Sequence, residues 1–106
     1  MSSLPKTPIS IESEKALLGS LIIDSESWEK ISNIITPADF YDSKNRDVFS
    51  EIYDLQINDQ PLDILILEES LKSRDKLLKI GGIEYLKELA KTVPTSAHII
   101  KYAEIV

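Results

Sequence analysis

The sequence has no cysteine, which excludes disulfide bonds and thiolate chemistry. It has no apolar run near the ~18 residues that a membrane span requires. The opening residues, MSSLPKTP, also lack the apolar stretch of a secretory signal. We therefore expect a cytoplasmic protein without a membrane partner. The chain has 106 residues, 42% of them hydrophobic, which suits one small domain with a real core.

Basic side chains are scarce, because 12 Lys and Arg stand against 18 Asp and Glu, for a net charge of −6. The densest basic group is a loose one at Lys72, Arg74, Lys76 and Lys79. Nucleic-acid binding draws most of its affinity from neutralised phosphates. A small autonomous helical module that binds nucleic acid is therefore the weaker alternative for this chain, and its DNA binding would have to depend steeply on salt.

Motifs that carry chemistry are also missing. None of the three glycines precedes a lysine as a phosphate-binding P-loop requires, and Gly81 and Gly82 are more typical of a helix end and turn. A zinc site needs several convergent ligands, whereas His98 is the only histidine. No serine or threonine stands beside a base in a triad pattern. We predict no catalytic, cofactor-binding or metal site in this chain.

What the sequence does contain is helical periodicity. After a flexible leader over residues 1–9, a first helix is expected to begin at Ser10, which would cap it. Glu12 and Glu14 are two residues apart and do not share a helix face, so they are better explained as surface charges near the positive end of the helix dipole than as an acid–base pair. The pattern predicts an all-α fold, a compact bundle of about six short helices over residues 10–106.

The later helix boundaries follow from capping residues. Asp24 is expected to cap a second helix that runs to Ile35, and residues 36–41 are expected to form a helical turn. Asp42 or Ser43 should cap a third helix. Residues 61–73 could be a strand, but apolar spacing and the lack of a pairing strand favour a helix capped by Asp63.

The C-terminal third is expected to hold a charged connector over 74–82 and two more helices. The first bears Ile83, Leu86 and Leu89, and Thr95 or Ser96 should cap the last. That final helix has no glycine or proline stop, which predicts that the chain is a fragment of a longer one.

Five residues are predicted to be structural: Gly19, Trp28, Phe40, Phe49 and Leu86. Gly19 interrupts the apolar run of the first helix, where glycine costs about 1 kcal/mol relative to alanine. A small residue there would let a neighbouring helix approach closely, and the expected neighbour is the helix with Phe49 and Ile52.

Tyr85 lies beside its helix's apolar stripe, so it is either a boundary core residue or a partner-facing aromatic anchor. Together with Lys79, Ile80 and Gly81 it forms the predicted protein-interaction surface.

An ordered set of motifs runs through nearly the whole chain. The pieces, in order, are P-x-S-I-E-x-E-x-A-x-L-G-S-L-I-x-D at 8–24, Trp28, P-x-D-F-Y at 37–41, R-x-V-F at 46–49, P-L-D at 61–63, Leu71 and Leu77, G-G-I-x-Y-L-x-x-L at 81–89, V-P-T-S-A at 93–97 and Y-A-x-I-V at 102–106. In this order the sequence resembles the N-terminal domain of the bacterial replicative DNA helicases, the DnaB family. Asn45 and His98 depart from the family pattern, and both are expected at surface or cap positions.

The resemblance implies a parent protein that is an ATP-driven 5′→3′ DNA-unwinding hexamer at the replication fork. ATP, magnesium and most DNA contacts would belong to a RecA-like motor domain after a helical hairpin and a linker, none of which this chain contains. The family's N-terminal domains form a collar with other helicase subunits and engage the C-terminal domain of the primase. For this chain alone, the resemblance implies no enzyme activity and a monomer or weak dimer.

Overall fold

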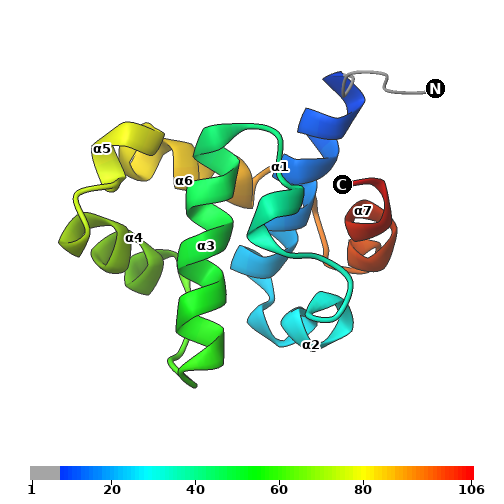
Figure 1. The fold of residues 1–106 in the computed structure, drawn as a ribbon, viewed down its shortest axis with the longest axis horizontal. Helices are drawn as coiled ribbons and strands as arrows, with labels where there is room; N and C mark the ends of the chain where they lie inside the picture. The colour runs from blue at the N-terminus through cyan, green and yellow to red at the C-terminus, as the bar shows by residue number, and fades with distance from the viewer. Residues whose placement is uncertain (1–7) are drawn as a thin grey trace.

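The computed structural model describes residues 8–106, so most of the expected leader lies outside its range. Within these residues the chain forms seven α-helices and two 3₁₀ turns, without any strand (Figure 1). The elements are α1 (Pro8–Ile23), η1 (Ser25–Ser27), α2 (Trp28–Ile31), η2 (Pro37–Asp39), α3 (Ser43–Ile57), α4 (Ile64–Ser73), α5 (Leu77–Ile80), α6 (Gly82–Ala90) and α7 (Ile99–Ile105). The predicted all-α class is confirmed. No helix in the described range is long and apolar enough to cross a membrane.

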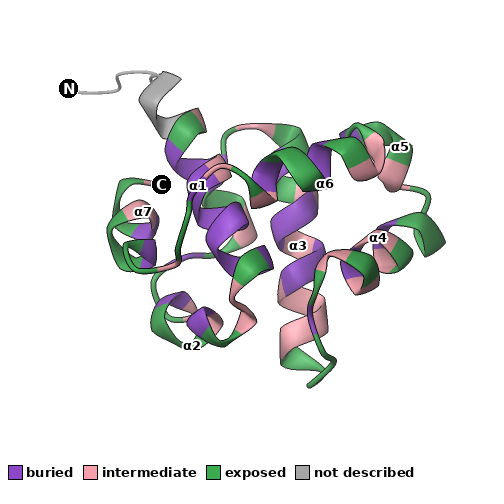
Figure 2. Ribbon diagram, turned by 180° about the vertical axis from the view of Figure 1, so that it is seen from behind, coloured by how far each residue is buried: buried purple, intermediate pink, exposed green. Residues whose placement is uncertain are grey.

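Helix α1 is the centre of the bundle and packs against α3, α6 and α7. From Ala16 onward its residues are apolar on nearly every side, which is typical of a helix surrounded by others. Leu17, Leu18 and Leu21 are fully buried, and Figure 2 shows buried positions around this helix. The helix begins at Pro8, two residues before the expected start at Ser10, because proline fits the first turn of a helix, where its missing N–H is not needed.

Aromatic rings fill the core between α2, η2 and α3. Phe40 stacks on Phe49 with ring centroids 4.8 Å apart, and both side chains are buried. Trp28 packs against Phe49 at 5.7 Å and against Tyr53 at 5.8 Å. This aromatic cluster attaches the irregular segment 24–42 to α3.

Three predicted helix starts are confirmed. The Asp42 side chain accepts hydrogen bonds from the backbone N–H groups of Lys44 and Asn45 at the start of α3. Asp63 accepts from the N–H of Ile66 at 2.8 Å, and the segment that could have been a strand is a helix over Ile64–Ser73. Thr36 and Asp39 form the expected capping box around Pro37.

The predicted connector at 74–82 is wrong, because α5 occupies its middle. Helix α4 ends in a Schellman turn, in which the N–H of Lys76 donates to the carbonyl of Leu71 and the N–H of Asp75 donates to that of Lys72. Asp75 takes the left-handed conformation with φ 60°, a position that usually holds glycine. The missing glycine hid this turn in the sequence.

Two other helix boundaries differ from expectation. Helix α2 ends at Ile31 rather than Ile35, since the β-branched run at 34–36 precedes a proline and disfavours helix. Asp24 does not cap a helix; its carboxylate accepts a hydrogen bond from Ser96 at 2.6 Å. This contact holds Ser96 in the preceding loop, and the last helix begins only at Ile99, with His98 exposed at its start.

Gly19 lies at a close helix contact, but with a different partner from the one expected. A Cβ atom added to Gly19 would lie 2.1 Å from the carbonyl oxygen of Leu89. The close neighbour is therefore the last turn of α6 and not the Phe49–Ile52 face of α3. The expected pairing was wrong because the sequence does not reveal which helix crosses α1 at this point.

Candidate protein-interaction surface

The four residues predicted to face a partner separate into two pairs. Tyr85 is only 9% exposed and Ile80 is fully buried, so both belong to the core. Lys79 and Gly81 are exposed at the end of α5 and the turn into α6. Gly81 takes a left-handed conformation with φ 108°, which ends α5 and starts α6 at a sharp angle. The ring of Tyr85 faces inward, which fits the alternative of a boundary core residue.

Tyr85 belongs to a buried polar cluster with Glu14 and Asn45. The Tyr85 hydroxyl donates to Asn45 Oδ1, and Asn45 Nδ2 donates to Glu14 Oε1 at 2.9 Å. The same carboxylate accepts from the backbone N–H groups of Tyr41, at 2.6 Å, and Asp42, at 3.3 Å. The cluster joins α1, α3 and α6 through the buried hydrogen bonds Tyr85–Asn45 and Asn45–Glu14.

Two predictions fail at this cluster. Glu14 and Asn45 were both expected at the surface or at a cap, yet both are 0% exposed. Each is buried because its polar atoms find partners on other helices, which removes the penalty for burying them. No local signal in the sequence indicated this, because Glu14 and Asn45 are 31 residues apart.

The electrostatics of the cluster keep Tyr85 protonated. Burial raises the pKa of its hydroxyl far above the ordinary value near 10, and the negative charges of Asp42, Glu88 and Glu14 add to the effect. Lys44 lies over the outer face of the ring, 4.5 Å from its centroid, in a cation–π contact. The site is therefore suited to holding α6 in place rather than to acid–base catalysis.

The exposed apolar surface of this end of the molecule is formed by α4 and α5. Leu78 is 89% exposed, the highest value among the exposed large apolar side chains of residues 11–106. A hollow of about 480 Å³ lies beside it, lined by Lys72, Asp75, Leu77 and Leu78. We call these four residues together with Lys76 and Lys79 the α4–α5 surface. Figure 1 shows α4 and α5 at the side of the bundle opposite α7.

Within the described part of the chain, the three lysines of the α4–α5 surface are unpaired, unlike the neighbouring Arg74. Lys72, Lys76 and Lys79 form no ion pair with any residue of the described range. Arg74 is different, since its Nε lies 3.0 Å from the buried Glu51 carboxylate, which also accepts from Ser70. The loose basic group of the sequence thus divides into one structural arginine and three free lysines.

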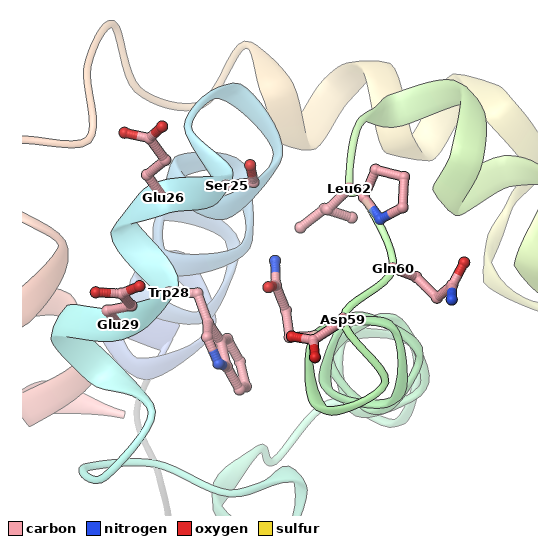
Figure 3. A pocket seen from close by; sticks show the side chains of 9 residues that line it. Ser25, Glu26, Trp28, Glu29, Asp59, Gln60 and Leu62 are labelled. Carbon is pink, nitrogen blue, oxygen red and sulfur yellow. The ribbon is translucent and has the colours of Figure 1, made fainter.

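A second hollow of about 460 Å³ lies between η1–α2 and the end of α3 (Figure 3). Its lining residues are Ser25, Glu26, Trp28, Glu29, Gln56, Asp59, Gln60, Pro61 and Leu62. In Figure 3, Trp28 and Leu62 extend toward the gap, whereas Glu26 and Glu29 turn away from it. No basic side chain lines this hollow, so it offers nothing to hold the phosphates of a nucleotide.

The long faces of α1 and α6 do not supply a basic stripe either. Lys15 pairs with Glu88, and this contact lowers the pKa of the Glu88 carboxyl. Lys87 pairs with Glu84 on the same helix. Residues 8–106 also contain no group of three or more His, Asp or Glu side chains placed to hold a metal ion. These arrangements give no support to the nucleic-acid-binding alternative.

Comparisons with known proteins agree with the fold. The family model of the DnaB-like helicase N-terminal domain matches residues 6–106. The replicative DNA helicase DnaB of Buchnera aphidicola subsp. Baizongia pistaciae is 40% identical over 106 residues, which cover all of this chain and 23% of that protein. The replicative DNA helicase DnaB of Geobacillus stearothermophilus is 36% identical over 99 residues, or 93% of this chain and 22% of that protein. The chain thus spans less than a quarter of these relatives.

A solved structure shares the same arrangement of helices. The crystal structure of the N-terminal domain of DnaB helicase from Mycobacterium tuberculosis superimposes with a TM-score of 0.86 and 32% sequence identity. The match covers 90% of this chain and 66% of that one.

Proposed function

The chain belongs to the family of DnaB-like helicase N-terminal domains, and we propose that it is the assembly and protein-interaction head of a replicative DNA helicase. In the whole protein this head supports the collar of a hexamer and docks the C-terminal domain of the primase. The observation that carries the proposal is the family match over residues 6–106. The printed name of the relatives, replicative DNA helicase, supports a role in DNA replication.

The proposal assigns the chemistry of unwinding to another part of the protein. ATP-dependent 5′→3′ unwinding, magnesium binding and most DNA contacts belong to a motor domain, because this sequence has no P-loop pattern. The chain alone neither hydrolyses ATP nor unwinds DNA. Nucleotide turnover by the pure chain, in proportion to its concentration, would refute this assignment.

Within the head, the α4–α5 surface is the best candidate for partner docking. It contains the exposed Leu78 and Lys79, and it adjoins Gly81. Lys79 and Gly81 are the two residues of the predicted interaction set that are accessible. Leu78 does not stand alone there, because it lines a hollow together with Leu77, Lys72 and Asp75.

Calorimetric titration of the chain with the primase C-terminal domain tests the docking role. We expect saturable binding in an equimolar complex, whereas absence of binding would leave only a structural role in the collar. Sedimentation velocity tests the assembly state. We expect a monomer or weak dimer of residues 1–106, and a stable hexamer would contradict that expectation.

A further inference from the structure

Helix α5 holds one leucine out of the core while its neighbours are anchored. Ile80 is fully buried, and Leu77 packs against the core cluster, so the short helix is attached to α3, α4 and α6. Leu78 lies on the opposite side and is 89% exposed. The fold therefore presents Leu78 on a rigid support. Little conformational entropy of this segment is then lost when a partner binds.

The hollow beside Leu78 has room for an inserted side chain. Its volume of about 480 Å³ is ample for one apolar side chain. Leu77 and Leu78 form its apolar part, and Lys72 and Asp75 stand at its edge. The Schellman turn at Arg74–Lys76 fixes the angle between α4 and α5, so the hollow is formed before any partner arrives.

The charge of this surface selects the kind of partner. Lys72, Lys76 and Lys79 have no carboxylate partner within residues 8–106, although the chain as a whole carries a net charge of −6. A partner with carboxylates would therefore find locally complementary charge here and repulsion over the rest of the surface. Nucleic acid is disfavoured, because an apolar leucine at the centre gains nothing from phosphates.

We propose that the α4–α5 surface binds a partner protein segment that inserts an apolar side chain beside Leu78 and places Asp or Glu carboxylates against Lys72, Lys76 and Lys79. This inference rests on the proposed docking function and specifies the chemistry of the docking segment. The apolar contact supplies most of the affinity, as central anchors do in protein interfaces. The lysines supply orientation and speed of association.

The test uses the chain and the primase C-terminal domain in calorimetry at two salt concentrations. Leu78→Ser should weaken binding roughly tenfold or more, the effect expected of a central apolar anchor. Lys79→Glu should also weaken binding, and the loss should be larger at low salt, where charges are less screened. The matched controls are Ile100→Ser and Lys101→Glu on α7, which replace an exposed isoleucine and lysine away from α5 and should leave affinity unchanged.

The outcomes separate the two claims. If the wild-type chain does not bind the primase domain, the proposed docking function fails and this inference fails with it. If the wild type binds and Leu78→Ser and Lys79→Glu bind equally well, docking stands but the α4–α5 surface is not the site. If Leu78→Ser changes only the self-association of the chain in sedimentation, the occupant is a second copy, and the inference of an acidic partner segment is overturned.

Discussion

Gly19→Ala offers the sharpest test of how the bundle packs. In an exposed helix this change stabilises a protein by about 1 kcal/mol, since alanine has the better helix propensity. Here the new methyl group would lie 2.1 Å from the Leu89 carbonyl oxygen and 3.2 Å from its carbon. That oxygen accepts a hydrogen bond from the N–H of Thr92 at 3.0 Å, so it is held in the last turn of α6 and cannot turn away freely.

The expected magnitude follows from two opposing terms. Overpacking of a core costs about 1–3 kcal/mol, and a clash with a backbone atom belongs at the upper end because α1 or α6 must shift as a whole. Subtracting the gain in helix propensity of about 1 kcal/mol leaves a net loss of roughly 2 kcal/mol. For a domain of this size that corresponds to a melting temperature lower by roughly 10 °C. Gly19→Leu should lose at least as much.

Urea denaturation followed by circular dichroism at 222 nm measures this loss, with an unchanged m-value as the sign that the same surface is exposed on unfolding. Gly82→Ala is the matched control, because the same methyl group there meets no atom within 4 Å. Because Gly82 has a φ of 73°, an alanine there must adopt the left-handed conformation, which should lower the free energy of unfolding by about 1 kcal/mol without any steric clash. A Gly19→Ala variant as stable as wild type, or more stable, would refute the close contact between α1 and α6.

Four further changes test other parts of the fold by the same denaturation assay. Asn45→Ala leaves Tyr85 and Glu14 without their shared partner, so we expect a loss of about 1–3 kcal/mol; a loss below about 0.5 kcal/mol would mean that water replaces the amide. Asp63→Ala removes the cap of α4 and should cost about 1 kcal/mol. Because the pKa of Tyr85 is raised in the folded state, its contribution is complete below the unfolded pKa near 10 and is lost as the pH rises above it; Tyr85→Phe should flatten this fall, and an identical pH profile would contradict it. Asp59→Gly should stabilise the chain by roughly 0.5–1 kcal/mol, because Asp59 is left-handed with φ 56° at the end of α3, and no gain would show that aspartate adopts this conformation without cost.

Local signals predicted most helices of this fold correctly. The caps at Asp42 and Asp63 and the turn around Pro37 involve hydrogen bonds between residues two or three positions apart, so the pattern of neighbouring residue types was enough to place them. The same reasoning failed for α5, because Asp75 occupies a left-handed position where glycine is the usual signal.

The exposure of the four predicted interaction residues could be judged only in part from the sequence. Lys79 and Gly81 are accessible as expected, whereas Tyr85 and Ile80 turn inward. Helical periodicity placed Tyr85 at the edge of its apolar stripe. It could not show that Asn45 Oδ1 lies close enough to accept a hydrogen bond from the Tyr85 hydroxyl. Leu78 was overlooked, since its exposure depends on which side of a four-residue helix meets the core.

The sequence by itself determined the helical class, most of the caps, the lack of a P-loop pattern and the resemblance to the helicase family, because each of these depends on the order of residues along the chain. Only the tertiary structure decided that Gly19 meets Leu89, and that Glu14, Asn45 and Tyr85 share one buried cluster. The partners in that cluster are 31 and 40 residues apart. Contacts over such separations arise from how whole helices cross, and this depends on the sum of many packing contacts rather than on any one residue.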